Sequence, residues 1–334
     1  MLQRQIFPKP VNPASFWNAT LSCLMAAANL CSVTSAAAAG PTWPVAHSKA
    51  ETQIQPVAVF GTDDRRDLPA SRAQSLSDKI GVLSIGRSNF CTAFCVAPDT
   101  IATASHCLLG TQEQQGPDLS RVTFNVGGEN MQLRSSPLLG STRKEVRRSI
   151  RAGTTGLRIR PPIAAERDWA VARLSKPVCT AGGLAMSALS RKDIEAQAAK
   201  GNIYQVAMHR DVAADHLVVG APCAMSRSFP QVRAETIALD FANANAILLH
   251  TCDTGLGSSG SPMLRDGAAG PEVVGINVGT YVISPPSTNL SSTAHSDEPT
   301  SEAIANTAVP VSQFRKAVDA FAATVAVGQQ TSRP

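Results

Sequence analysis

Three short segments carry side chains that together could cleave an acyl bond. The first is residues 257–262 (GSSGSP), with Ser259 between two glycines. A serine hydroxyl is a weak nucleophile that needs a base to take its proton and N–H donors to hold the oxyanion. The glycines allow a tight turn, so the amides of Gly257 and Ser259 are candidates for the oxyanion hole. A Gly/Ser-rich stretch alone more often forms an ordinary loop, so this serine needs partners elsewhere.

The candidate base is His106, in residues 103–107 (TASHC) at the end of an apolar run. A lone histidine is more often structural than catalytic. Here Cys91 lies sixteen residues before Cys107. A disulfide between them would tie the strand that carries His106 to its neighbour and hold the imidazole in place.

The candidate acid is Asp168, which opens residues 168–174 (DWAVARL) just before a predicted buried strand. A carboxylate there can accept the Nδ1–H of His106, leave Nε2 free for the serine and stabilise the imidazolium. By itself Asp168 would be an ordinary residue at a strand start.

The elements that must position these residues are predicted to be strands. Short apolar runs are broken by turns without βαβ alternation, which is typical of an all-β sandwich or barrel. The predicted strands are residues 80–86, 92–97, 100–105, 122–128, 169–174, 203–208, 216–221, 246–252 and 273–283. A short helix or linker is expected at 186–200, a Pro/Ser/Thr-rich loop at 284–301 and an amphipathic helix at 311–325. A G-x-S-x-G elbow is excluded because Ser261, not glycine, lies two after Ser259.

The motifs T-A-S-H-C, D-W-A-V and G-S-S-G-S-P, in this order, resemble the trypsin-like serine peptidases. Residues 61–65 (GTDDR), 91–94 (CTAF) and 252–254 (CDT) look like the bacterial glutamyl-endopeptidase-like (V8-like) branch. The resemblance covers roughly residues 59–320. It implies an all-β, chymotrypsin-like fold of two six-stranded antiparallel β-barrels with a C-terminal helix. It also implies a serine endopeptidase with His106, Asp168 and Ser259 as its triad and no cofactor or metal.

The resemblance also divides the chain. Residues 79–185 are expected to form the N-terminal barrel with His106 and Asp168, and residues 186–283 the C-terminal barrel with Ser259. Residues 284–334 are expected to form the flexible loop and the helix. A peptidase-like binding module without catalysis is the alternative, although such relatives normally lack a member of the triad. A third alternative, a non-enzymatic structural β protein of the envelope, would explain the composition but not the order of the motifs.

Three residues depart from the family pattern. Ser105 replaces a small apolar residue, and Ala93 replaces the glycine of a C-T-G stretch. Ser258 replaces the aspartate that pairs with the freed N-terminus in animal trypsins. The sequence therefore gives no support for activation through that ion pair.

The specificity pocket is expected to use residues before Ser259 and on a strand after it. Asp253 lies six positions before Ser259, where trypsins place an acid, and Thr254 lies where glutamyl endopeptidases place a threonine. On the later strand, Asn277 stands where those enzymes have a histidine, and Gly279 follows it. The missing histidine argues against a glutamate preference. Asp253 could equally be a structural partner of a backbone turn.

Six cysteines remain after an expected signal peptide, and an even number in an exported chain indicates disulfides. Six cysteines allow fifteen pairings. Cys91–Cys107 is the preferred pair, Cys223–Cys252 is plausible, and Cys95–Cys179 follows by elimination. A zinc site at Cys91, Cys95, His106 and Cys107 is the rival, disfavoured because adjacent residues converge poorly on one tetrahedral metal.

The first forty residues have the layout of a secretory signal peptide. A basic start precedes a modestly apolar stretch at 21–33 and an A-x-A cleavage site after Ala38 or Ala39. The stretch is too short and polar for a membrane span, and Cys23 and Cys31 lack a lipid-anchor pattern. Residues 41–78 then form a propeptide or an N-terminal arm. We expect a periplasmic or secreted monomer, not inserted in a membrane after signal removal.

The net charge of +5 is partly gathered in basic residues between Arg143 and Arg160, with no aromatic residue interleaved. Single-stranded nucleic acids are bound by basic grooves with aromatic residues that stack on the bases. We therefore interpret the cluster as a solvated surface loop. The expected partner is a protein or peptide substrate and not a nucleic acid.

Overall fold

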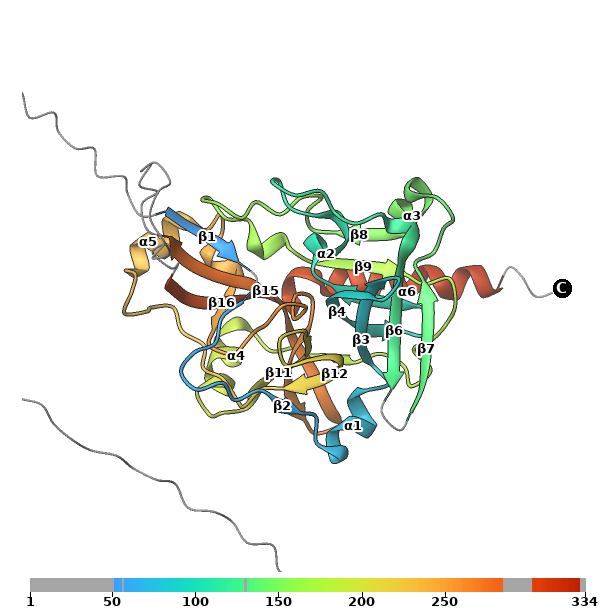
Figure 1. The fold of residues 1–334 in the computed structure, drawn as a ribbon, viewed down its shortest axis with the longest axis horizontal. Helices are drawn as coiled ribbons and strands as arrows, with labels where there is room; N and C mark the ends of the chain where they lie inside the picture. Colours follow the sequence, from blue (N-terminus) through green and yellow to red (C-terminus); the bar gives the residue numbers. More distant parts are fainter. Residues whose placement is uncertain (1–50, 56, 129–130, 285–301, 331–334) are drawn as a thin grey trace, which may run out of the picture. The chain divides into compact units, whose positions relative to one another are not determined.

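A computed structural model describes residues 51–55, 57–128, 131–284 and 302–330 (Figure 1). The expected signal peptide, residues 41–50 of the expected arm and nearly all of the expected loop at 284–301 lie outside the described residues. All of the elements described below belong to one compact unit that begins at His47.

The first sheet contains the two predicted strands nearest His106 and Asp168. Seven strands pair in the order β7-β6-β3-β4-β5-β9-β8, and all pairs are antiparallel. A bridge between Leu138 and Leu174 joins the ends of β7 and β9, so the sheet curls on itself. The strands are β3 (Ile80–Ile85), β4 (Ser88–Ala97), β5 (Thr100–Thr103), β6 (Val122–Gly128), β7 (Met131–Pro137), β8 (Ile150–Ala152) and β9 (Ala170–Arg173).

The second sheet includes the strands before and after the loop that carries Ser259. Its order is β13-β16-β15-β14-β11-β12-β2, and both β1 and β10 pair with β15. The amide of Cys223 donates to Ile203 O, and Met225 bridges to His250, so this segment links β11 to β13. The strands are β1 (Glu51–Gln55), β2 (Arg66–Asp67), β10 (Ala185–Met186), β11 (Ile203–His209), β12 (Ala213–Val219), β13 (Leu248–His250), β14 (Pro262–Gly267), β15 (Gly270–Ser284) and β16 (Glu302–Pro310).

Helices are few and lie outside the sheets (Figure 1). They are α1 (Ala70–Leu76), α2 (Ser105–Leu109), α3 (Arg143–Arg148), α4 (Arg191–Ala198), α5 (Ala234–Asp240) and α6 (Val311–Gln330), with 3₁₀ turns η1 (Leu119–Arg121), η2 (Ala165–Arg167) and η3 (Ala244–Ala246). The C-terminal helix α6 buries Phe314 and Val318. Among the described helices, none is long and apolar enough to cross a bilayer.

The prediction of an all-β chain with a C-terminal helix is confirmed, but the strand counts differ from six and six. The described residues form sheets of seven and nine strands, and β10 pairs with β15 in parallel. Strand β16 was not expected. Its sequence, EAIANTAVP, is rich in Ala, Asn and Thr, and it becomes a strand because β13 and β15 pair with it on both sides. Residues 284–334 therefore hold a strand of the second sheet as well as the helix.

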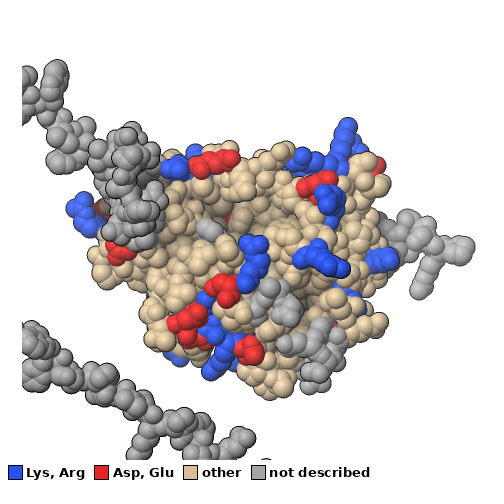
Figure 2. Space-filling view, in the orientation of Figure 1, with Lys and Arg blue, Asp and Glu red and all other residues tan. Residues whose placement is uncertain are grey.

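The basic residues of the expected surface loop at 143–148 instead form α3. Thr142 and Glu145 make a reciprocal capping box that satisfies the first turn of this helix. Figure 2 shows Lys and Arg gathered near α3, with acidic side chains among them. Arg160, another basic residue of the expected cluster, pairs with Glu113 at 2.7 Å.

Candidate active site

His106 and Asp168 meet because their two strands are neighbours. His106 lies in α2, directly after β5, and Asp168 ends η2, two residues before β9. β5 and β9 pair antiparallel, with Thr103 opposite Ala170. The end of one strand therefore lies beside the start of the other, which brings together two residues 62 positions apart.

The Asp168 carboxylate takes part in three hydrogen bonds, one of them with the imidazole of His106. Its Oδ2 lies 2.6 Å from Nδ1 of His106, and its Oδ1 accepts from the His106 backbone N–H at 2.8 Å. The hydroxyl of Ser105 also donates to Oδ1, at 2.7 Å. With the Nδ1–H directed at Asp168, Nε2 is the nitrogen available for proton transfer. In the sequence, Ser105 departs from the small apolar residue of the family pattern. In the structure, its hydroxyl is a hydrogen-bond donor to the Asp168 carboxylate.

His106 and Asp168 each shift the pKa of the other toward its charged form. Burial lowers the pKa of His106, but the Asp168 carboxylate beside it outweighs that effect and holds the pKa above its ordinary value. Burial raises the pKa of Asp168, but the imidazole and the hydrogen bonds from Ser105 and His106 hold it below its ordinary value. Although Asp168 is completely buried, these interactions favour its ionised form, which can pair with an imidazolium.

Ser259 lies on a tight loop between β13 and β14. Gly257 and Gly260, on either side, have φ angles of +100° and +83°, which L side chains rarely adopt. The hydroxyl of Ser259 donates to Val278 O at 3.0 Å. In the described part of the chain, no hydrogen bond joins this hydroxyl to His106. The two residues nevertheless line the same cavity, of about 250 Å³.

The amides of Gly257 and Ser259 belong to peptides whose carbonyl groups are anchored elsewhere. Leu256 O accepts from the Arg210 amide at 2.8 Å, and Ser258 O accepts from Asn277 Nδ2 at 3.2 Å. In a trans peptide the N–H points opposite to the C=O. Within the described residues neither amide donates a hydrogen bond, so both remain able to bind an oxyanion.

Asp253 and Thr254 both contact the N-terminal arm. Asp253 is 3 % exposed, and its carboxylate accepts from the amides of Phe60 at 2.8 Å and Asp64 at 3.1 Å. Burial raises the pKa of Asp253, although these two amides oppose the rise. Thr254 Oγ1 accepts from the Ala58 amide at 3.1 Å, and the Thr254 amide donates to Ala58 O at 2.8 Å.

Behind Thr254 lies a buried polar residue that the sequence did not single out. Oδ1 of Asn306, on β16, lies 3.1 Å from the Thr254 hydroxyl and 2.6 Å from the Thr280 hydroxyl. Its Nδ2 donates to Cys252 O at 2.6 Å. No local motif marks Asn306, because the pairing of β16 with β15 places it there.

Asn277 and Gly279 lie on β15 but differ in what they face. Asn277 is fully buried, and its side chain braces the nucleophile loop at Ser258. Gly279 lies against β1, where a Cβ would come within 2.8 Å of Gln55 O. Of the predicted pocket residues, Asn277 therefore supports the loop, and Gly279 borders the arm.

Three disulfides tie the described segments together: Cys91–Cys107, Cys95–Cys179 and Cys223–Cys252. The first joins β4 to α2 beside His106. Both described groups of cysteine and histidine that could hold a metal contain the two sulfurs of one disulfide. Sulfurs in a disulfide are not thiolate ligands, which disfavours the zinc alternative.

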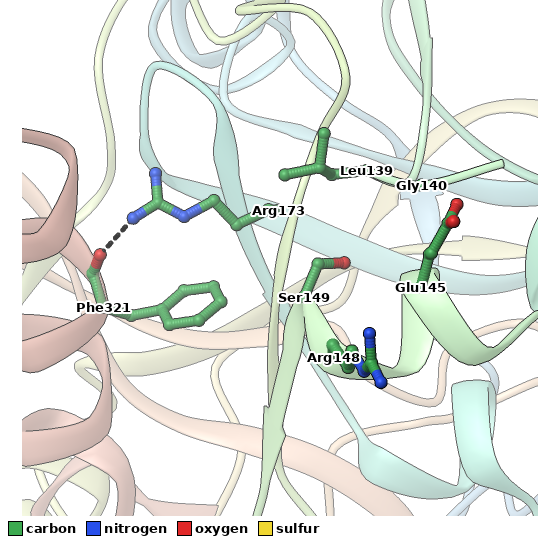
Figure 3. A pocket seen from close by; sticks show the side chains of 7 residues that line it. All are labelled: Leu139, Gly140, Glu145, Arg148, Ser149, Arg173 and Phe321. Carbon is green, nitrogen blue, oxygen red and sulfur yellow. Dashed lines mark hydrogen bonds between the residues drawn. The ribbon is translucent and has the colours of Figure 1, made fainter. Parts of the chain in front are cut away.

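A separate hollow of about 420 Å³ lies beside α6, lined by Leu139, Gly140, Glu145, Arg148, Ser149, Arg173 and Phe321 (Figure 3). The Arg173 guanidinium donates to Phe321 O and lies 4.9 Å from the Phe321 ring centroid. This hollow shares no residue with the cavity of His106 and Ser259. The contacts of Arg173 with Phe321 hold α6 against β9.

The two largely antiparallel sheets define a chymotrypsin-like fold, in which His106 and Ser259 line one cavity. A family profile for the trypsin-like peptidase domain matches residues 91–276, a span that includes His106, Asp168 and Ser259. The chain belongs to this family of trypsin-like peptidases. A solved structure titled Glu endopeptidase in complex with MPD is 16 % identical, with a TM-score of 0.48, over 78 % of this chain and 100 % of that one. No curated protein matches the chain.

Proposed function

We propose that the chain is an exported serine endopeptidase that hydrolyses peptide bonds through an acyl-enzyme. The observation that carries the proposal is the 2.6 Å contact of His106 Nδ1 with the buried Asp168, with Ser259 in the same cavity. A carboxylate so placed fixes the imidazole for proton transfer at Nε2. The three disulfides support export, because such bonds persist in oxidising compartments.

In the first half-reaction, the Ser259 hydroxyl leaves Val278 O and turns toward His106. Its oxygen attacks the scissile carbonyl carbon while Nε2 of His106 takes its proton. The amides of Gly257 and Ser259 hold the oxyanion. The intermediate collapses, the C–N bond breaks, and His106 returns the proton to the leaving amine. The products are an acyl ester on Ser259 and a free amine.

In the second half-reaction, water takes the place of the amine. His106 accepts a proton from the water as its oxygen attacks the ester carbonyl. The ester bond then breaks, and His106 returns the proton to Ser259. Asp168 stays ionised throughout and stabilises the imidazolium in both steps. The substrate is a protein or peptide, and no cofactor takes part.

The test is labelling by a fluorophosphonate probe, which esterifies an activated serine. We expect labelling of the mature chain and none in Ser259→Ala, whereas Ser228→Ala, at an exposed serine, should label as the wild type does. Labelling of Ser259→Ala at full strength would overturn the assignment.

A second candidate function is a catalytically inactive binding module. The hydrogen bond of the Ser259 hydroxyl to Val278 O favours it, because in the structure this hydroxyl is directed at a backbone carbonyl and not at His106. This function predicts that a correctly oxidised mature chain cleaves no member of a peptide library and is not labelled by the probe.

A further inference from the structure

Strand β1 lies along the edge of β15 that leads to Ser259. The pairing is antiparallel and places Gln53 opposite Val282, Ile54 opposite Tyr281 and Gln55 opposite Thr280. Figure 1 shows β1, in blue, beside the end of β15. A strand at such an edge occupies the backbone donors and acceptors that would otherwise bind an extended peptide.

Contacts on both sides hold β1 in this position. The Ile54 amide donates to Ile159 O at 2.9 Å, so the backbone of β1 is also bound on the side away from β15. The Thr52 hydroxyl donates to Asp240 at 2.9 Å, and Ile54 is only 8 % exposed. Gly279 lets β1 approach, since a Cβ there would lie 2.9 Å from Cγ2 of Ile54. The surface beside β15 therefore fits β1 closely.

This strand also closes one side of the candidate active site. Ile54 and Gln55 line the cavity together with His106, Ser259 and Val278. A polypeptide that brings a carbonyl carbon to Ser259 has to pass through this cavity. An extended substrate and β1 therefore compete for the same edge of β15.

The arm does not continue across Ser259 as a substrate would. After β1, its next described contacts are those of Ala58 with Thr254 and of Phe60 with Asp253. After β1 the arm therefore runs along Asp253 and Thr254, which precede Ser259 in the same loop. The carbonyl oxygen of Val278, a β15 residue that lines the cavity, accepts from the Ser259 hydroxyl. The nucleophile and the strand edge are occupied at the same time.

We propose that β1 is an internal inhibitor, a segment that occupies the substrate edge of β15 in the manner of a bound strand. The proposal rests on the proposed peptidase function. Activity toward extended peptides then requires β1 to leave, by displacement or by cutting of the arm. A small reagent that reacts with Ser259 with the help of His106 can do so while β1 stays in place.

The first experiment compares Ile54→Asp with Val59→Asp. Both variants place a carboxylate in the arm, but Ile54 is buried under the cavity, whereas Val59 is 38 % exposed. We expect Ile54→Asp to raise kcat/KM on an internally quenched peptide library at least tenfold. Labelling of Val59→Asp by a small alkyl fluorophosphonate should stay within twofold of wild type, and Ile54→Asp should still be labelled. Equal peptide cleavage by all three proteins, with normal labelling, would overturn the inhibitor while leaving the peptidase intact.

A second experiment needs no variant and so covers the case in which Ile54→Asp fails to fold. Wild-type protein is treated with a tetrapeptidyl diphenyl phosphonate or with the small alkyl fluorophosphonate, and amide exchange is followed by mass spectrometry. We expect the peptidyl probe, once bound to Ser259, to speed exchange over residues 51–55 at least tenfold, and the small probe to leave it unchanged. Unchanged exchange with the peptidyl probe bound overturns the inhibitor. If neither probe labels any protein, the peptidase function itself fails.

Discussion

The hydroxyl of Ser259 donates to Val278 O at 3.0 Å, and Val278 belongs to the strand whose edge β1 covers. His106 and Asp168 are already joined at 2.6 Å. Under the proposed function, the base and the acid are therefore already paired, whereas the hydroxyl of the nucleophile is bonded to another group. The proposed reaction therefore requires the Ser259 hydroxyl to leave Val278 O and turn toward His106.

Asp168→Asn should lower kcat by about 10⁴-fold, because an amide cannot fix the correct tautomer or stabilise the imidazolium. The wild-type pH profile of kcat/KM should rise through a midpoint above 6.5, since Asp168 raises the pKa of His106 and only the neutral imidazole acts as base. In Asp168→Asn that midpoint should move down. A rate and midpoint equal to wild type would show that Asp168 is only structural.

Replacing Cys91 and Cys107 with Ala should lower the free energy of unfolding by about 3 kcal/mol, from the loop entropy of a 16-residue separation. The matched pair is Cys95 and Cys179, with a separation of 84 and a loss of about 4.5 kcal/mol on the same relation. Because Cys107 adjoins His106, the first variant should also lose peptidase activity at temperatures where it stays folded. Urea unfolding followed by fluorescence measures the first effect, and library cleavage the second. Full activity in folded C91A/C107A would argue against a positioning role.

Gly260→Ala should destabilise the protein by about 3 kcal/mol or more, because it combines a left-handed backbone with a steric clash. The added Cβ would lie 2.0 Å from Thr103 Oγ1 and 2.4 Å from Thr92 O. Gly270→Ala is the matched control, with φ at +116° and no atom within 4 Å of the new Cβ. It should cost only the strain, about 1 kcal/mol. Equal losses in urea unfolding would contradict the clash.

Two buried histidines should make the protein less stable in mild acid. Burial lowers the pKa of both His209 and His250 to about 4, with Arg65 adding to the effect at His209. Between pH 6.5 and about 4 the unfolded chain binds protons that the folded chain does not, so the free energy of unfolding falls as pH falls. Each histidine contributes a slope of up to about 1.4 kcal/mol per pH unit. In His209→Asn, urea unfolding from pH 7 to 4.5 should show a shallower decline; an unchanged slope would exclude His209 as a source.

The sequence was informative where chemistry restricts both the residue type and its place on a strand. His106 and Asp168 each stand next to a predicted strand, Ser259 stands between two glycines, and the order of the three along the chain resembles one family. The structure pairs β5 with β9 and places His106 and Ser259 in one cavity, whereas their catalytic roles stay a prediction. The predicted strands at 80–86, 203–208 and 273–283 correspond to β3, β11 and β15 for the same reason, since their apolar runs need burial.

What the sequence left undetermined depends on contacts between distant segments. Asn306 lies beside Thr254 only because β16 pairs with β15. The Ser105 hydroxyl acquires its role from Asp168, 63 residues away. Strand β1 has no strong apolar alternation in its sequence, ETQIQ, and is formed by its pairing with β15. Local patterns do not record such partners.

The role of Asp253 is settled by removing its charge. The carboxylate is buried and already accepts the amides of Phe60 and Asp64, so we expect it to anchor the arm and not to bind a basic P1 side chain. Asp253→Asn keeps one acceptor but loses the charge, and charge-assisted hydrogen bonds are about twice as strong as neutral ones. The variant should therefore loosen residues 60–64 in hydrogen exchange while the P1 profile on a peptide library stays that of wild type. If the variant lost only cleavage after Arg or Lys, and exchange at 60–64 did not change, Asp253 would instead be the acid that binds a basic P1 side chain.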